Sequence, residues 1–97
     1  MVLPEVIIHL LIKLCSIRKQ LSWQIYCNYV DAAGRSIFHI VLNDTVRNTR
    51  FAKLTFYADT LEVLQCQYVG YKPSMPVELT DLLLELIHFE IEQTSTF

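Results

Sequence analysis

The segment from Trp23 to Tyr68, WQIYCNYVDAAGRSIFHIVLNDTVRNTRFAKLTFYADTLEVLQCQY, decides the fold of this chain. Apolar and polar residues alternate along four successive runs, which we place at residues 22–30, 36–42, 49–57 and 61–68. Alternation with a period of two predicts β-strands that are buried on one face. The connections between the runs are short, so the strands should follow one another as an antiparallel meander.

The first hairpin has a turn with Gly34, which can supply the positive φ that a turn needs. A loop over residues 32–35 predicts the register of the two strands. On the face toward the core this loop gives the pairs Asp31–Ser36, Tyr29–Phe38, Cys27–Ile40 and Ile25–Leu42. On the open face it gives the pairs Val30–Ile37, Asn28–His39 and Tyr26–Val41. This register gathers apolar residues on one face, which favours it.

The third strand continues the alternation, and the fourth leaves two alternatives open. The third strand should point Ala52, Leu54 and Phe56 toward the core, and Phe51, Lys53, Thr55 and Tyr57 toward the open side. The turn at residues 58–60 has no glycine to define its type, so its length is ambiguous. A two- or four-residue loop would bury Leu61 and Val63. A three-residue loop, which we favour, would bury Leu64, Cys66 and Tyr68, expose Gln65 and Gln67, and bring Glu62 toward the core.

Helical segments should flank the sheet at both ends of the chain. The first, from Pro4 to about Lys19, is apolar except for one stripe, which comprises Glu5, His9, Lys13, Ser16 and Gln20. The second, from about Met75 to Gln93, is amphipathic with an acidic stripe. We therefore predict one α+β domain over residues 1–97, a four-stranded antiparallel meander sheet with both helices packed on one face, in the order α-β-β-β-β-α.

The apolar surface of the first helix is wide for a chain of 97 residues, of which 53% are hydrophobic. A single small core has limited capacity to bury such an arc. The sequence therefore predicts a homo-oligomer, a dimer by preference, with the first helix at the interface.

Glu90 interrupts the apolar side of the last helix. One interpretation is that the last helical turn extends past the sheet into water. The other is an ion pair with Lys13, Arg18 or Lys19, because an unpaired buried carboxylate is costly. In the second case, Glu90→Gln should change the stability or the oligomeric state.

Three features of the sequence favour a cytoplasmic protein. Cys15, Cys27 and Cys66 have no clustered spacing and lie in apolar runs, as buried thiols do in a reducing compartment. The apolar run near the N-terminus carries Glu5 where a signal peptide would be basic, and it is too short to span a bilayer. We therefore expect no association with a membrane.

Motifs for catalysis and for metal binding are absent from the sequence. His9, His39 and His88 do not stand at the short spacings that preform a ligand pair. No glycine-rich elbow or phosphate-binding loop surrounds a nucleophile, and four of the ten acidic residues belong to one helix stripe. We expect a protein that is not an enzyme and that has neither cofactor nor metal.

The open face of the sheet is the one constellation that indicates a function. It combines tyrosine, asparagine, histidine and lysine, a composition typical of protein interfaces. The residues predicted to bind a partner are Tyr26, Asn28, His39, Lys53 and Tyr57. The sequence thus predicts a small non-catalytic module, such as an adaptor, an assembly subunit or an inhibitor, that binds a protein through this face.

Two alternatives belong to other classes of function. A single-stranded nucleic acid could stack its bases on the rings of Tyr26, Phe51 and Tyr57, with Arg47, Arg50 and Lys53 neutralising its phosphates. The net charge of −2 argues against this interpretation. A small-ligand binder or an enzyme could have its site in a dimer cleft. Salt-sensitive binding of oligonucleotides or a ligand-dependent rise in melting temperature would identify these classes.

Overall fold

The computed structural model of the chain describes residues 3–94, apart from the side chains of residues 27 and 28. Six elements follow one another along the chain: α1 (Glu5–Ile17), β1 (Leu21–Val30), β2 (Ser36–Asp44), β3 (Thr49–Tyr57), β4 (Val63–Tyr68) and α2 (Leu79–Thr94). The strands form one antiparallel sheet in the order β1-β2-β3-β4. The predicted α+β meander with a helix at each end is confirmed.

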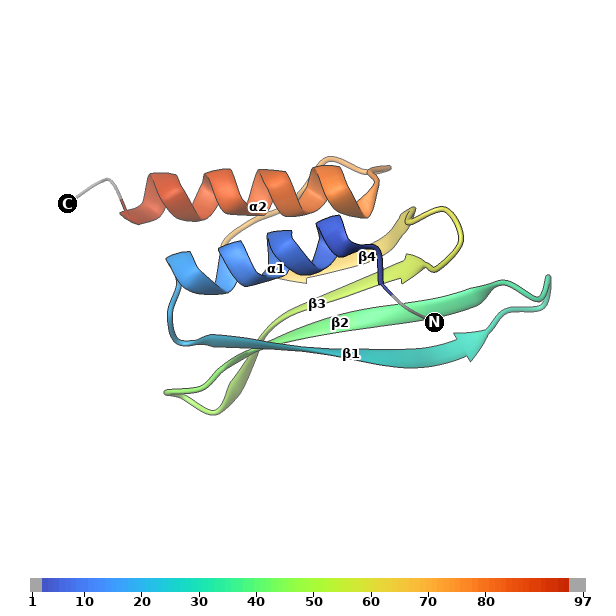
Figure 1. Cartoon of the computed structure of the whole chain (residues 1–97), viewed down its shortest axis with the longest axis horizontal. Helices are drawn as coiled ribbons and strands as arrows, with labels where there is room; N and C mark the ends of the chain where they lie inside the picture. Colours follow the sequence, from blue (N-terminus) through green and yellow to red (C-terminus); the bar gives the residue numbers. More distant parts are fainter. Residues whose placement is uncertain (1–2, 95–97) are drawn as a thin grey trace.

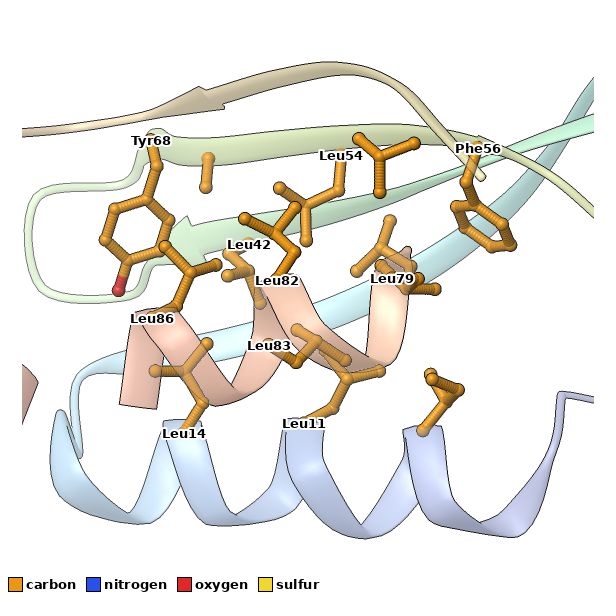
Figure 2. Close-up of a cluster of buried hydrophobic side chains, with 14 of the residues drawn as sticks. Leu11, Leu14, Leu42, Leu54, Phe56, Tyr68, Leu79, Leu82, Leu83 and Leu86 are labelled. Carbon is orange, nitrogen blue, oxygen red and sulfur yellow. The ribbon is translucent and has the colours of Figure 1, made fainter. Parts of the chain in front are cut away.

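Both helices lie on the same face of the sheet, side by side (Figure 1). The buried core joins them, because it contains residues from α1, from α2 and from one face of β2, β3 and β4. Figure 2 shows Leu11 and Leu14 of α1 directed toward Leu83 and Leu86 of α2. The two helices, which are far apart in the sequence, are therefore held together by one hydrophobic core.

The register of the first hairpin differs from the predicted one by two residues, since Ile25 pairs with Ile40 instead of Leu42. One residue of this shift comes from the turn, which is shorter than expected. The Asp31 N–H donates to the Arg35 carbonyl at 2.9 Å, so the loop comprises three residues.

The second residue of the shift comes from a β-bulge between Cys27 and Tyr29. A shift by one residue exchanges the two faces of a strand, and a second shift restores them. The first part of β1, through Tyr26, therefore keeps its predicted faces. Tyr29 lies between the bulge and the turn, opposite Ile37 instead of Phe38, and is 55% exposed. Its predicted place on the buried face was wrong.

Another bulge moves Phe51, which we expected on the open face. Leu42 pairs with Ala52 and Asn43 pairs with Arg50, so Phe51 is the extra residue of β3. Its ring packs against the core and meets the Tyr68 ring edge-on at 4.9 Å. Phe51 thus belongs to the face that the helices cover.

A third bulge in β4 combines features of the two alternatives for that strand. Phe56 pairs with Val63 and Leu54 pairs with Cys66, with the shift in between. Val63 is buried, as the two- or four-residue loop predicted, and Tyr68 is buried, as the three-residue loop predicted. Leu64, which the three-residue loop would bury, is 40% exposed. The exposure of Gln65 and Gln67, which the favoured three-residue loop predicted, is confirmed.

The last helix begins at Leu79 and not near Met75 as predicted. Residues 77–79 instead pair with residues 61–63 at the start of β4. The Val63 N–H donates to the Val77 carbonyl at 3.0 Å, and the Leu79 N–H donates to the Leu61 carbonyl at 2.8 Å. Tertiary pairing has replaced the first helical turn.

Most of the apolar arc of α1 is covered within one chain. Ile7, Leu11 and Leu14 are buried, whereas Val6 and Ile12 remain 49% and 54% exposed. At 100° per residue these two lie on opposite flanks of the polar stripe and form no common patch. Neither helix within residues 3–94 has the length and apolar content needed to cross a bilayer.

Glu90 is 1% exposed and belongs to a polar cluster inside the domain. Its carboxylate accepts a hydrogen bond from Arg18 Nε at 3.1 Å and one from Tyr68 Oη at 2.8 Å. The predicted ion pair with Arg18 is confirmed, and the interpretation of a helix end in water was wrong.

Candidate functional site

The open face is the face of the sheet opposite the two helices, and neither helix lies over it (Figure 1). Alternation along the strands directs a set of polar and aromatic residues to this side. The described members with exposed or half-buried side chains include Gln24, Tyr26, Tyr29, His39, Lys53, Tyr57, Gln65 and Gln67. Beneath them Ile37, Val41 and Thr55 are buried, so the face has a packed base and a polar surface.

Tyr26 and His39 form the centre of this surface at the β1–β2 pair. They are directly opposite in the register, and their ring centroids lie 5.4 Å apart. The Tyr26 hydroxyl donates to Gln24 Oε1, and the tyrosine remains 45% exposed. Such a ring can bury apolar area against a partner while its hydroxyl stays hydrogen-bonded.

Burial and the positive charges of Lys53 and Arg50 lower the pKa of the His39 imidazole. Its Nδ1 atom is buried and has no hydrogen-bond partner among the described residues. Lys53 and Arg50 thus both lie close enough to His39 to disfavour its charged form.

A basic hollow of about 470 Å³ lies at the β3–β4 end of the sheet, next to Lys53. Ten residues line it: Arg50, Phe51, Ala52, Lys53, Cys66, Gln67, Tyr68, Val69, Tyr71 and Lys72. No carboxylate is among them, and within the described part of the chain its three cations form no ion pair. The basic hollow thus concentrates positive charge beside aromatic rings in a chain whose net charge is −2.

Tyr57 lies on the open face as predicted, but its ring is covered. The Arg35 guanidinium carbon is 3.5 Å from the ring centroid. Asp59 holds the guanidinium there through bonds of 3.2 Å from Nε and 3.0 Å from the terminal nitrogen. The bond from Arg35 lowers the pKa of the Asp59 carboxyl. Tyr57 is therefore less available to a partner than Tyr26.

The residues predicted to contact nucleic acid do not form one platform. Arg50 and Phe51 both line the basic hollow, whereas Arg47 lies in the turn at residues 45–48 and is not part of its lining. The Phe51 ring is engaged by Tyr68 and by the Arg18 guanidinium, whose carbon lies 4.9 Å from the ring centroid. Of the three rings expected to stack with bases, Tyr26 is the most accessible.

Lys72 and Arg35 were missed by sequence reasoning, for different reasons. Lys72 is the only lysine or arginine after Tyr57. The neighbouring sequence does not predict that its loop returns beside β3. Arg35 follows the turn glycine, and its position over Tyr57 depends on the pairing of β2 with β3. A search for bases next to hairpin turns could have suggested Arg35.

The described thiols, Cys15 and Cys66, lie in environments that keep them protonated. Burial raises the pKa of Cys15, and burial together with Glu85 raises the pKa of Cys66 to about 11. Both thiols are therefore protonated at neutral pH and are weak nucleophiles. In residues 3–94, no group of three or more histidine, cysteine or carboxylate side chains is placed to hold a metal ion.

The structure thus brings together Tyr26, His39 and Lys53 from the predicted set. Tyr57 lies on the same face with its ring covered by Arg35, and the Asn28 side chain lies outside the described residues. Comparisons of the chain with protein-family models, with curated proteins and with solved structures found no match.

Proposed function

We propose that this protein is a small non-catalytic interaction module that binds a protein partner through its open face. The observation that carries the proposal is a sheet face without helical cover, on which the exposed Tyr26 lies between polar neighbours. Aromatic rings with polar tips on a packed base are characteristic of binding surfaces between proteins.

The basic hollow supports a partner with an acidic segment. No carboxylate lines the hollow beside Arg50, Lys53 and Lys72. A negative charge on a partner would therefore interact favourably with each of these cations. Complementary charges of this kind guide association and suppress wrong partners. Acidic side chains of the partner would enter the hollow while its apolar residues cover Tyr26.

A nucleic acid is the second candidate, because the same three cations could neutralise phosphates. It has less support than a protein partner, since arginine side chains engage two of the three predicted stacking rings. A small organic anion in the hollow is the third candidate, as about 470 Å³ lies within the usual range for ligand pockets.

The experiment is a pull-down from native extract, treated with nuclease, using three forms of the protein. Tyr26→Ala/Lys53→Glu should lose partners that the wild type retains. Lys13→Glu makes the same charge change on the exposed side of α1 and should retain them. Identical prey from the wild type and the double variant would refute the role of the open face.

The alternatives have their own readouts. Oligothymidylate that binds at low salt, leaves as salt rises and is lost in Lys53→Glu would favour the nucleic acid. A higher melting temperature with small organic anions would favour the ligand site.

We further propose that the chain self-associates as a dimer and resides in the cytoplasm. The free thiols of Cys15 and Cys66 agree with a reducing compartment. The high hydrophobic content remains the argument for self-association, although α1 is largely covered within one chain.

A further inference from the structure

The outer edge of β1 is the longest uncovered sheet edge in the described structure. β1 comprises ten residues and pairs only with β2 on one side. The other edge of the sheet is partly covered, because residues 77–79 pair with the start of β4 and Tyr71 bridges to Tyr68 at its end. A row of unpaired backbone groups along β1 is a template for another strand.

The hydrogen bonds of the first hairpin indicate which groups of β1 point outward. The Thr45 N–H donates to the Gln20 carbonyl at 2.7 Å, just before the strand begins. Bonded residues alternate along an antiparallel pair, so Gln24 bonds toward β2 while Trp23 and Ile25 direct their N–H and C=O groups away. These outward groups lie before the bulge, in the regular part of the strand.

Devices that normally protect an edge are absent from the first part of this strand, residues 21–26. The sequence of β1, LSWQIYCNYV, contains no charged residue and no proline. Its bulge lies near the turn and leaves the stretch from Leu21 to Tyr26 regular. Edge strands that remain in water are usually short, interrupted or charged.

We infer that β1 pairs antiparallel with β1 of a second copy of this chain, giving one continuous sheet across a two-fold axis. This inference rests on the proposed self-association and specifies its surface. Paired residues in a sheet point to the same face, so Gln24 and Tyr26 meet the open face of the partner. Trp23 and Ile25, half-buried in one chain, meet their counterparts at the edge of the core.

The absence of charge removes an obstacle to pairing between two copies of this edge. Two identical strands placed across a two-fold axis repel each other if they carry charges, and β1 carries none. The α1 helix offers a weaker surface, because its exposed Val6 and Ile12 lie on opposite flanks of a polar stripe.

The test compares charged variants of Gln24 with matched variants of Gln65, an exposed glutamine of β4 on the same face. Gln24→Lys and Gln24→Glu should each raise the dimer Kd about threefold to fivefold, because like charges then meet near the two-fold axis. An equimolar mixture of the two should restore dimer formation. Gln65→Lys and Gln65→Glu should dimerise as the wild type does. Sedimentation velocity measures the Kd, and circular dichroism checks folding.

Hydrogen exchange of the wild-type protein provides a test that needs no variant. The amides of Trp23 and Ile25 should be protected at concentrations where the dimer forms and should exchange faster on dilution. Monomeric wild type at every concentration would overturn both the self-association and the β1 interface. Three results would overturn the β1 interface alone: a dimer Kd unchanged by Gln24→Lys, loss of the dimer in Ile12→Lys, or no protection of the Trp23 and Ile25 amides in the dimer.

Discussion

At the scale of single residues, Glu90 connects segments that are far apart in the chain. Arg18 follows α1, Tyr68 ends β4, and both donate to the same buried carboxylate of α2. Burial and the bond to Glu90 raise the pKa of the Tyr68 hydroxyl, so it remains a donor at all physiological pH values. A buried charge is tolerated when its partners satisfy it, and each partner then limits how the elements can pack.

Removing the charge of Glu90 should destabilise the protein. Glu90→Gln is expected to lower the free energy of unfolding by about 1–3 kcal/mol. The loss should remain below that of a fully buried pair, because Arg18 is 33% exposed and can be hydrated. Urea denaturation measures the change, with Glu62→Gln on the surface as the control.

Tyr68→Phe should lower the free energy of unfolding by about 1–2 kcal/mol, because one oxygen of Glu90 loses its donor. The double variant with Glu90→Gln should cost less than the sum of the two single changes, since the residues share one hydrogen bond. Additive losses would mean that the bond contributes little.

Acid should weaken the turn between β2 and β3 through Asp44. Backbone N–H groups of Arg47 and Val46 donate to its carboxylate and lower its pKa. A lowered pKa contributes stability above the unfolded-state value of about 4, and this contribution is lost as the pH falls through the folded-state value.

Asp44→Asn retains an acceptor oxygen but cannot titrate. The variant should be less stable than the wild type at pH 7, and the difference should shrink at about pH 3. Urea denaturation at both pH values measures this. An equal difference at both would contradict the assignment to Asp44.

At the scale of elements, the three bulges account for the residues that simple alternation assigned to the wrong face of the sheet. Bulges at residue 28, at Phe51 and at Leu64 each add one residue to a strand. Simple alternation cannot signal them, because an extra residue leaves composition and length almost unchanged. The strands and most of their faces were predictable from the sequence, whereas the faces on which Tyr29 and Phe51 lie were not.

The α1 helix should tolerate changes on one side and not on the other. Leu11→Ala removes a fully buried side chain and is expected to cost about 2–5 kcal/mol. Ile12→Lys, one position further along, should cost about 0.5 kcal/mol or less, since Ile12 is exposed. Chemical denaturation checks both. A large loss in Ile12→Lys would indicate that α1 is covered by a second chain.

At the scale of the whole molecule, one core holds together an elongated body of 48 × 26 × 23 Å. The turn between β1 and β2 extends past the ends of both helices (Figure 1). Since no second core exists in residues 3–94, the hairpin depends on the part of β1 and β2 that the helices cover.

Unfolding should therefore be a single cooperative transition. Trp23, the only tryptophan of the chain, reports on β1, and far-UV circular dichroism reports mainly on the helices. Their thermal transitions should coincide at a fixed protein concentration. An earlier fluorescence transition would mean that the first hairpin melts separately from the core.

The sequence by itself determined the elements, their order, the antiparallel meander and the existence of an open face. These follow from local patterns, namely the two periods of apolar residues and the shortness of the connections. Only the tertiary structure decided the register, the start of α2, the burial of Glu90 and the gathering of Arg50, Lys53 and Lys72. Each of these depends on contacts between residues that are distant in the chain, and local patterns contain no information about which distant groups meet.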